Sequence, residues 1–184
     1  MKKTMTIFMM CLLTIALNAQ NLFRFKTENG KYGFKNEKGT VVIPAKYDNV
    51  QDFSEGLALV ELKIKYGFID KTGKEVIPFK YYFAESFSGG YAAIGIFGQA
   101  GQIKMGFINK AGKEITPIKY DNVENFSEWL AVVKLNDKYG FIDKTGKEII
   151  PLIYDSAESF ENGKATVSFE GEYYDIDKTG EKVE

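Results

Sequence analysis

The sequence contains no histidine and one cysteine among its 184 residues, and its charged residues nearly balance at a net charge of −1. Without histidine there is no imidazole general base, no Ser-His-Asp or Cys-His nucleophile set, and no usual zinc ligand set. The chain has no excess of lysine and arginine, which a nucleic-acid-binding protein would need to contact phosphates. What remains is a globular composition, 45% hydrophobic and 27% charged, with 15% aromatic residues. We therefore expect no catalytic residues, no bound metal and no cofactor.

The N-terminal residues have the pattern of a secretory signal peptide. Two lysines precede an apolar run from Met5 to Leu17, and Ala19 is a small residue suited to cleavage. The run is shorter than the roughly 20 residues needed to span a bilayer. Cys11 lies inside the run instead of after it, where a lipidated cysteine has to be. We predict a cleaved signal peptide at residues 1–19, no membrane span in the mature chain, and a destination in the periplasm, at the cell surface or outside the cell.

The remainder, residues 20–184, is predicted to be one domain of about five repeats of roughly 34 residues each. A short aromatic–glycine motif recurs along the chain, and the third interval between its copies is longer than the others because of residues 97–103. We predict that this segment, rich in glycine and glutamine, forms a loop. The motif residues are Tyr32-Gly33, Tyr66-Gly67, Met105-Gly106 and Tyr139-Gly140.

The pattern inside each repeat predicts strands. In the last repeat Lys164, Thr166 and Ser168 alternate with apolar residues, which is the period of a strand with one buried face. Each repeat also has an Asp or Asn followed three residues later by Gly, typical of a type I turn that closes a hairpin. Two-residue hairpin turns are expected at Asn29-Gly30, Lys63-Ile64, Asn136-Asp137 and Glu170-Gly171.

Each repeat is thus predicted to be a three-stranded antiparallel meander. The proline after the third strand is expected to end it, because proline cannot donate to a ladder. The connecting segment, such as residues 46–50, fits either a short extra strand or a turn of helix. These prolines are Pro44, Pro78, Pro117 and Pro151.

The end repeats favour an open arrangement of the meanders. A column of phenylalanines in the second strand becomes Asp175 in the last repeat, and the adjacent isoleucine column is Lys35 in the first. Terminal repeats of open arrays are polar on the face that lacks a neighbour. We therefore predict an all-β fold forming an open twisted β array, with a closed propeller- or barrel-like ring as the alternative.

The string Lys-Tyr-Gly-Phe-Ile-Asp-Lys-Thr-Gly-Lys-Glu-Val-Ile-Pro, from Lys65 to Pro78, resembles the WG-repeat family of bacterial proteins. The resemblance covers about five units, from Lys31 to the end of the chain. In this sequence tyrosine, or Met105, stands where the family has tryptophan. The resemblance implies a β-repeat architecture, often in exported proteins, that serves as an interaction module without an assigned activity.

Residues that break the repeat symmetry are the candidates for binding a partner. Trp129 is the only tryptophan, and it stands where other repeats have Gly56, Gly90 and Gly163. Exposed aromatic side chains commonly anchor protein contacts or stack on sugars. The alternative is that Trp129 fills a local gap in packing. The full candidate set is Trp129, Tyr81, Tyr82, Phe83 and Tyr91.

Three hypotheses for function follow. The first is a non-enzymatic exported repeat protein that binds a protein partner as an interaction or scaffold module at the cell envelope. The second is a glycan- or cell-wall-binding module that uses Tyr82, Tyr91 and Trp129. The third is an enzyme of unknown type, since composition alone does not exclude a pair of catalytic carboxylates.

Overall fold

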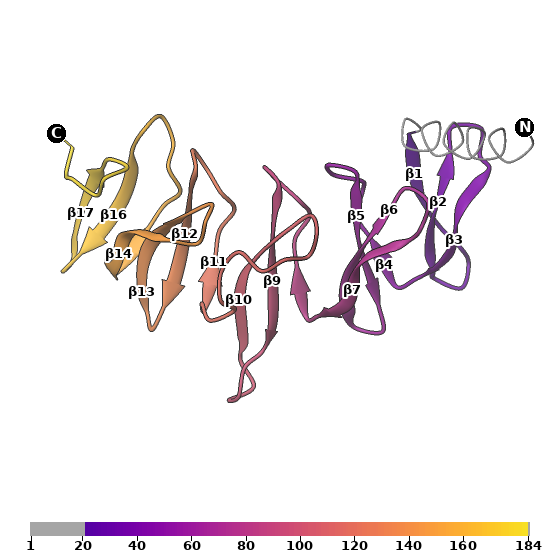
Figure 1. Cartoon of the computed structure of the whole chain (residues 1–184), viewed down its shortest axis with the longest axis horizontal. Helices are drawn as coiled ribbons and strands as arrows, with labels where there is room; N and C mark the ends of the chain where they lie inside the picture. The colour runs from indigo at the N-terminus through magenta and orange to yellow at the C-terminus, as the bar shows by residue number, and fades with distance from the viewer. Residues whose placement is uncertain (1–20, 184) are drawn as a thin grey trace, which may run out of the picture. The chain divides into compact units, whose positions relative to one another are not determined.

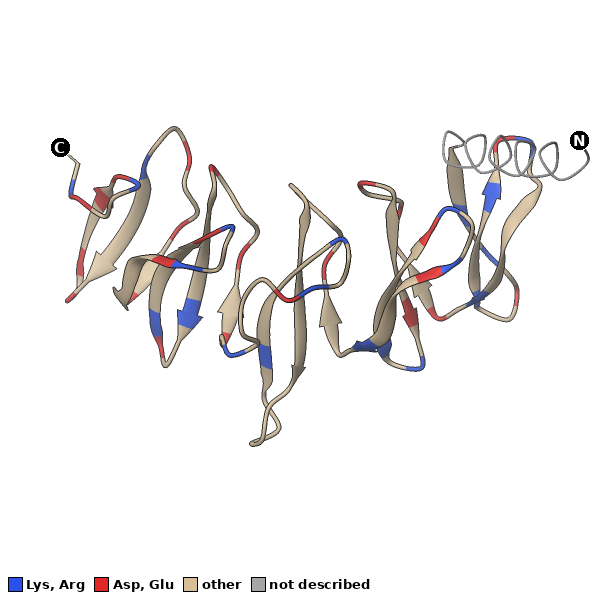
Figure 2. Ribbon diagram, in the orientation of Figure 1, with Lys and Arg blue, Asp and Glu red and all other residues tan. Residues whose placement is uncertain are grey.

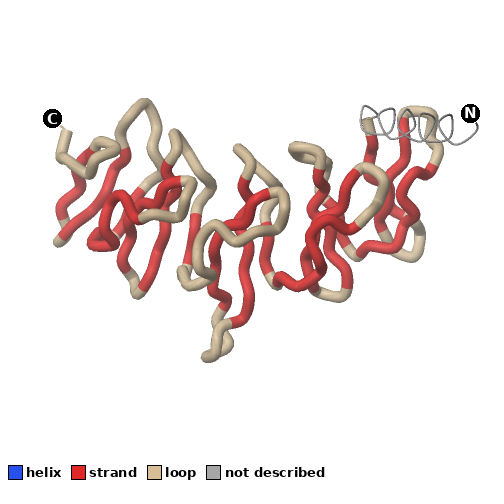
Figure 3. The backbone as a smooth tube through the Cα atoms, viewed as in Figure 1, coloured by secondary structure: helices blue, strands red, loops and turns tan. Residues whose placement is uncertain are grey.

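The computed structural model describes residues 21–183, and within them the chain consists of strands, turns and loops (Figure 3). No helix in this range is long and apolar enough to cross a membrane. The predicted signal peptide, residues 1–19, lies outside the described residues. The chain divides after Lys80 into two compact units.

The first unit holds two antiparallel sheets (Figure 1). One sheet has the order β1-β2-β3, and the other has the order β4-β5-β6-β7. The strand bounds are β1 (Leu22–Lys26), β2 (Tyr32–Asn36), β3 (Val41–Tyr47), β4 (Asn49–Val50), β5 (Leu57–Leu62), β6 (Lys65–Asp70) and β7 (Glu75–Tyr81).

The second unit holds three antiparallel sheets, with the orders β10-β9-β8, β11-β12-β13-β14 and β15-β16-β17. Its strands are β8 (Phe83–Ala84), β9 (Tyr91–Phe97), β10 (Ile103–Asn109), β11 (Asn122–Val123), β12 (Leu130–Leu135), β13 (Lys138–Asp143), β14 (Glu148–Tyr154), β15 (Ser156–Ala157), β16 (Ala165–Phe169) and β17 (Glu172–Ile176).

All five sheets are antiparallel meanders of three or four strands, and none is closed or strongly curled. The predicted all-β fold is therefore confirmed, and the barrel-like alternative applies to none of these sheets. The connecting segment at residues 46–50 contains a short strand, β4, which pairs with β5 through Asn49↔Glu61 and Val50↔Val60.

The predicted hairpin turns are confirmed at most positions. Lys63-Ile64 and Asn136-Asp137 both have positive φ at the two turn residues, as a type I′ turn requires. Asn29-Gly30 was wrongly predicted as a two-residue turn: the loop runs from Thr27 to Lys31, and only Gly30 has positive φ. The Asp-x-x-Gly turns form as predicted, with Gly73 N–H donating to Asp70 O at 2.9 Å.

The prediction that proline ends the third strand is wrong for three of the four prolines, whereas Pro117 lies outside any strand. Pro44 lies inside β3, where the β2–β3 register shifts between Tyr32↔Tyr47 and Phe34↔Ile43. A bulged residue does not donate to the ladder, so a proline, which has no N–H, fits there. The bulge also brings the β3 backbone against Gly33. A Cβ atom on Gly33 would lie 2.4 Å from the Ile43 carbonyl oxygen. The glycine of the repeat motif is therefore required by close backbone approach, and the backbone of Ile150 and Leu152 crowds Gly140 in the same way.

Buried aromatic and aliphatic side chains pack between adjacent repeats in each unit. Phe34 is fully buried in the first unit, and its ring centroid lies 4.8 Å from that of Phe53. In the second unit, the Phe141 and Phe160 centroids are 4.9 Å apart. At the chain ends, Lys35 is exposed, as its place in the first repeat predicts, whereas Asp175 is half-buried.

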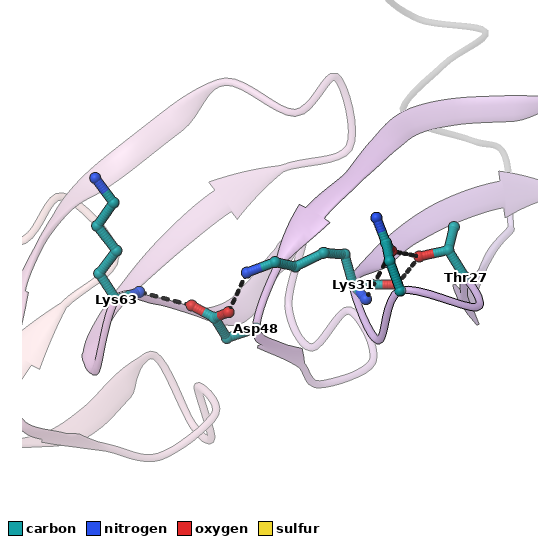
Figure 4. Close-up of polar contacts among 5 residues, drawn as sticks. Thr27, Lys31, Asp48 and Lys63 are labelled. Carbon is teal, nitrogen blue, oxygen red and sulfur yellow. Dashed lines mark hydrogen bonds and ion pairs between the residues drawn. The ribbon is translucent and has the colours of Figure 1, made fainter.

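A Lys–Asp pair recurs in three repeats and joins a hairpin to the connecting segment. Charges of both signs are interspersed along the chain (Figure 2). Asp48 accepts a hydrogen bond from Lys31 Nζ and another, at 2.7 Å, from the Lys63 backbone N–H (Figure 4). Asp121 likewise accepts from Lys104 and from the Asn136 N–H. The position equivalent to Asp48 and Asp121 between β7 and β8 is occupied by Tyr82.

We expect acid to destabilise the protein through these carboxylates. Hydrogen bonds from Lys31 and the Lys63 N–H hold the pKa of Asp48 below its ordinary value of 3.8, and Lys104 lowers the pKa of Asp121. Because the folded-state pKa is depressed, the stabilisation is present above the unfolded-state pKa and is lost as pH falls through the folded-state value. The melting temperature should be level near neutral pH and decline below about pH 5. Thermal denaturation of Asp121→Asn should show a weaker decline, and an identical pH profile would contradict this explanation.

Candidate functional site

Trp129 occupies the second position of a two-residue turn that leads into β12. The Ser127 N–H donates to Leu130 O at 2.9 Å and the Leu130 N–H donates to Ser127 O at 3.0 Å, which closes the turn. The indole side chain is 72% exposed. The alternative that Trp129 fills a gap in packing is therefore wrong, because most of the side chain faces solvent.

The backbone of Trp129 is in the left-handed region, with φ at +81°. The equivalent turn residues are Gly56, Gly90 and Gly163, with φ between +83° and +91°. A left-handed conformation costs a residue with a Cβ atom roughly 1–2 kcal/mol, a cost that glycine avoids. The fold therefore holds an exposed tryptophan at a position where its backbone is strained.

Two further side chains complete the site, which we call the Trp129 cluster: Trp129, Lys144 and Tyr91. The Lys144 Nζ atom lies 4.6 Å from the Trp129 ring centroid and 5.5 Å from the Tyr91 ring centroid. Both distances allow a cation–π interaction. Lys144 comes from the turn after β13, and Leu130 pairs with Asp143, so Trp129 and Lys144 are neighbours at one end of the β12–β13 pair.

A neighbouring ion pair borders the Trp129 cluster. Glu128 Oε2 accepts a hydrogen bond from the Gly163 N–H at 3.0 Å and pairs with Lys178 Nζ at 2.9 Å. The Lys178 ammonium, followed by the Gly163 N–H, holds the pKa of Glu128 below its ordinary value. Glu128 is therefore ionised at neutral pH and is engaged by the following repeat.

The three candidates at residues 81–83 do not form one surface. Tyr81 is fully buried, so its place in the partner-binding set is corrected: its ring is not accessible. Phe83 is half-buried against the core of the second unit. Tyr82 is half-buried, and its ring centroid lies 4.3 Å from that of Phe97, a side chain that is 51% exposed.

The structure brings Tyr91 to Trp129 but places Tyr82 elsewhere. Tyr91 begins β9, whereas the Tyr82 N–H donates to Gly95 O near the end of that strand, beside Phe97. The six residue steps from Tyr91 to Phe97 span about 20 Å in a strand. The predicted set of Tyr82, Tyr91 and Trp129 is therefore split between the two ends of β9.

Sequence reasoning missed Lys144 and the adjacent Gly89. A Cβ atom on Gly89 would lie 3.6 Å from Lys144 Nζ, so this glycine borders the ammonium group. The sequence does mark Gly89 as unusual, because the equivalent turn position holds a glutamate in two other repeats, Glu55 and Glu128. The contact itself joins two repeats, which the sequence alone does not show.

Residues 21–183 contain no group of three or more Cys, Asp or Glu side chains that could hold a metal ion. The features of the Trp129 cluster are an exposed indole, a lysine ammonium and a phenol ring. The rings can contact an apolar surface, and the ammonium can bind an anion. The chemistry of these side chains therefore suits the binding of a ligand.

Fold and site together define a tandem β-repeat protein. The sequence matches the family described as WG containing repeat at residues 32–63, 66–96, 105–139 and 139–173. These matches cover more than half of the chain, and the protein belongs to this family. No curated protein matches the sequence.

Proposed function

We propose that the chain is a non-enzymatic, exported repeat protein that binds a protein partner at the cell envelope through the Trp129 cluster. The observation that carries the proposal is the strained, 72% exposed Trp129 in a turn that other repeats build with glycine. Residues held in unfavourable backbone regions cluster at functional sites. Tryptophan is also enriched among residues that dominate binding energy at protein interfaces.

Two sequence features support the remaining parts of the proposal. The signal-peptide pattern of residues 1–19 supports export. The absence of histidine from the whole sequence supports a binding role over catalysis by the commonest general base. Acidic side chains such as Asp48 and Asp143 are engaged in an ion pair and in a turn of the repeat.

The test is a cross-linking pull-down from the source cell envelope with the mature chain and Trp129→Gly. Glycine removes the indole and suits the backbone, so stability should be unchanged or raised, by up to about 1 kcal/mol. We expect the variant to bind the recovered partner about thirtyfold more weakly, as removal of an interface tryptophan does.

Tyr173→Ser is the matched control, because Tyr173 is 74% exposed and lies on β17, away from the Trp129 cluster. It should recover the partner as the unaltered chain does. Equal recovery by Trp129→Gly would contradict the proposal.

A glycan-binding module is the second candidate, and the observation that favours it is the pairing of exposed Trp129 with half-buried Tyr91 around Lys144. Aromatic rings of this kind stack on sugars. A glycan array and a peptidoglycan pull-down with the same two variants distinguish it: binding that requires Trp129, with no protein partner recovered, would favour the glycan.

A further inference from the structure

The last two repeats contain a built carboxylate site. The Glu128 carboxylate receives two donors from the repeat that follows it: the Gly163 backbone N–H at 3.0 Å and Lys178 Nζ at 2.9 Å. Gly163 is the second residue of its two-residue turn, and Lys178 belongs to the turn after β17. One carboxylate oxygen thus accepts from a turn amide and a lysine together.

The same two donors recur one repeat earlier, but the acid does not. By position in the repeat, Trp129 corresponds to Gly163, Lys144 corresponds to Lys178, and Gly89 corresponds to Glu128. The Gly89 Cβ position is 3.6 Å from Lys144 Nζ, so a side chain there would reach the ammonium group.

Among the described residues, no acidic side chain is paired with these donors. Within residues 21–183, the Trp129 N–H makes no hydrogen bond, and the contacts of the Lys144 ammonium are with the rings of Trp129 and Tyr91. In the next repeat the equivalent N–H and lysine both bind the Glu128 carboxylate. The Trp129 N–H and Lys144 therefore favour a carboxylate in the same way, since charge-assisted hydrogen bonds are the stronger ones.

We propose that the Trp129 N–H and Lys144 bind the side-chain carboxylate of an acidic residue in a partner protein. This inference rests on the proposed function and names the chemistry of the partner. The Trp129 and Tyr91 rings, which flank Lys144, contact the apolar groups on either side of that carboxylate. An acidic peptide is the favoured ligand because Glu128, a polypeptide side chain, makes the equivalent contacts in the next repeat.

Gly89→Glu tests the inference by supplying the acid from within the chain. The backbone accepts it, because Gly89 has φ +58° and the glutamates at the equivalent positions, Glu55 and Glu128, have φ +51° and +47°. The new carboxylate should pair with Lys144 and compete with the partner. Gly89→Gln is the matched control, with the same size and no charge.

The probe is a blocked pentapeptide with one glutamate between two leucines, compared with its glutamine analogue and with a glucuronic acid trimer. Because the chain has one tryptophan, the fluorescence of Trp129 reports binding directly. We expect the glutamate peptide to bind at least about tenfold more tightly than the glutamine peptide. Gly89→Glu and Lys144→Gln should each remove this preference, and Gly89→Gln should keep it.

Equal binding of the two peptides would overturn the inference, and so would an undiminished preference in Gly89→Glu or a response to the glucuronic acid trimer alone. Absence of any fluorescence response to the three probes would also overturn it. Different results would reject the proposed function and the acidic ligand. A pull-down partner lost with Trp129→Gly but retained with Gly89→Glu would leave the proposed function standing and reject the acidic ligand. A glutamate-selective titration without any Trp129-dependent partner would reject the proposed function instead.

Discussion

Gly140→Ala should lower the free energy of unfolding by about 3 kcal/mol, and the melting temperature by roughly 10 °C. A Cβ atom on Gly140 would lie 2.7 Å from the Ile150 carbonyl oxygen and 2.8 Å from the Leu152 nitrogen. Both atoms belong to the backbone of β14, so relief requires β13 and β14 to separate at the bulge around Pro151. Urea and thermal denaturation followed by circular dichroism measure the loss.

Gly98→Ala is the control for this prediction. Like Gly140 it does not need positive φ, but the atoms nearest to its Cβ position include the flexible side chains of Lys104 and Gln102. We expect a change within about 0.5 kcal/mol. Similar losses for both variants would show that close backbone approach is not the reason for the motif glycine.

Phe160→Ala should cost about 3–5 kcal/mol, the range for removing a buried phenylalanine. Phe160 is 1% exposed and Phe141 is fully buried, and the two rings meet edge to face with centroids 4.9 Å apart. Phe160 lies between β15 and β16 whereas Phe141 lies on β13, so the pair joins two adjacent repeats. The free energy of unfolding from urea denaturation measures the loss.

Tyr173→Ala provides the comparison at an exposed aromatic residue of the neighbouring strand β17. Its side chain is 74% exposed, so we expect a change within about 0.5 kcal/mol. If Phe160→Ala costs no more than Tyr173→Ala, the contact between Phe141 and Phe160 does not stabilise the interface between the repeats.

The strands and most of the turns could be predicted because each depends on residues close together in the sequence. Alternation of residues 164–169 predicts β16, although burial does not follow the alternation, since Ser168 is buried and Phe169 is exposed. Asp143 with Gly146 predicts the turn between β13 and β14. The role of Pro151 could not be predicted in this way. A bulge is a mismatch between two strands, and the sequence of one strand does not show how many residues lie opposite it.

The candidate site was predicted in part. Trp129 stands out because it replaces a glycine, and the structure shows that it is exposed. The pattern at residues 81–83 did not reveal which aromatic ring is buried, since Tyr81 packs inside whereas Tyr82 contacts Phe97. Lys144 was missed because its significance depends on Gly89, a residue of the preceding repeat.

The contacts between adjacent repeats also bear on how the chain folds and how its length can change. In the second unit, hydrogen bonds between repeats join residues 33 to 40 positions apart, from the Ser127–Phe160 contact to the Asn125–Glu85 contact. Each repeat of this unit is thus stabilised by its immediate neighbours within the unit, and folding can begin in one pair of these repeats and spread to the next. Insertion or deletion of one whole repeat would preserve this spacing, whereas a deletion of half a repeat would mismatch every pairing that spans the deleted segment.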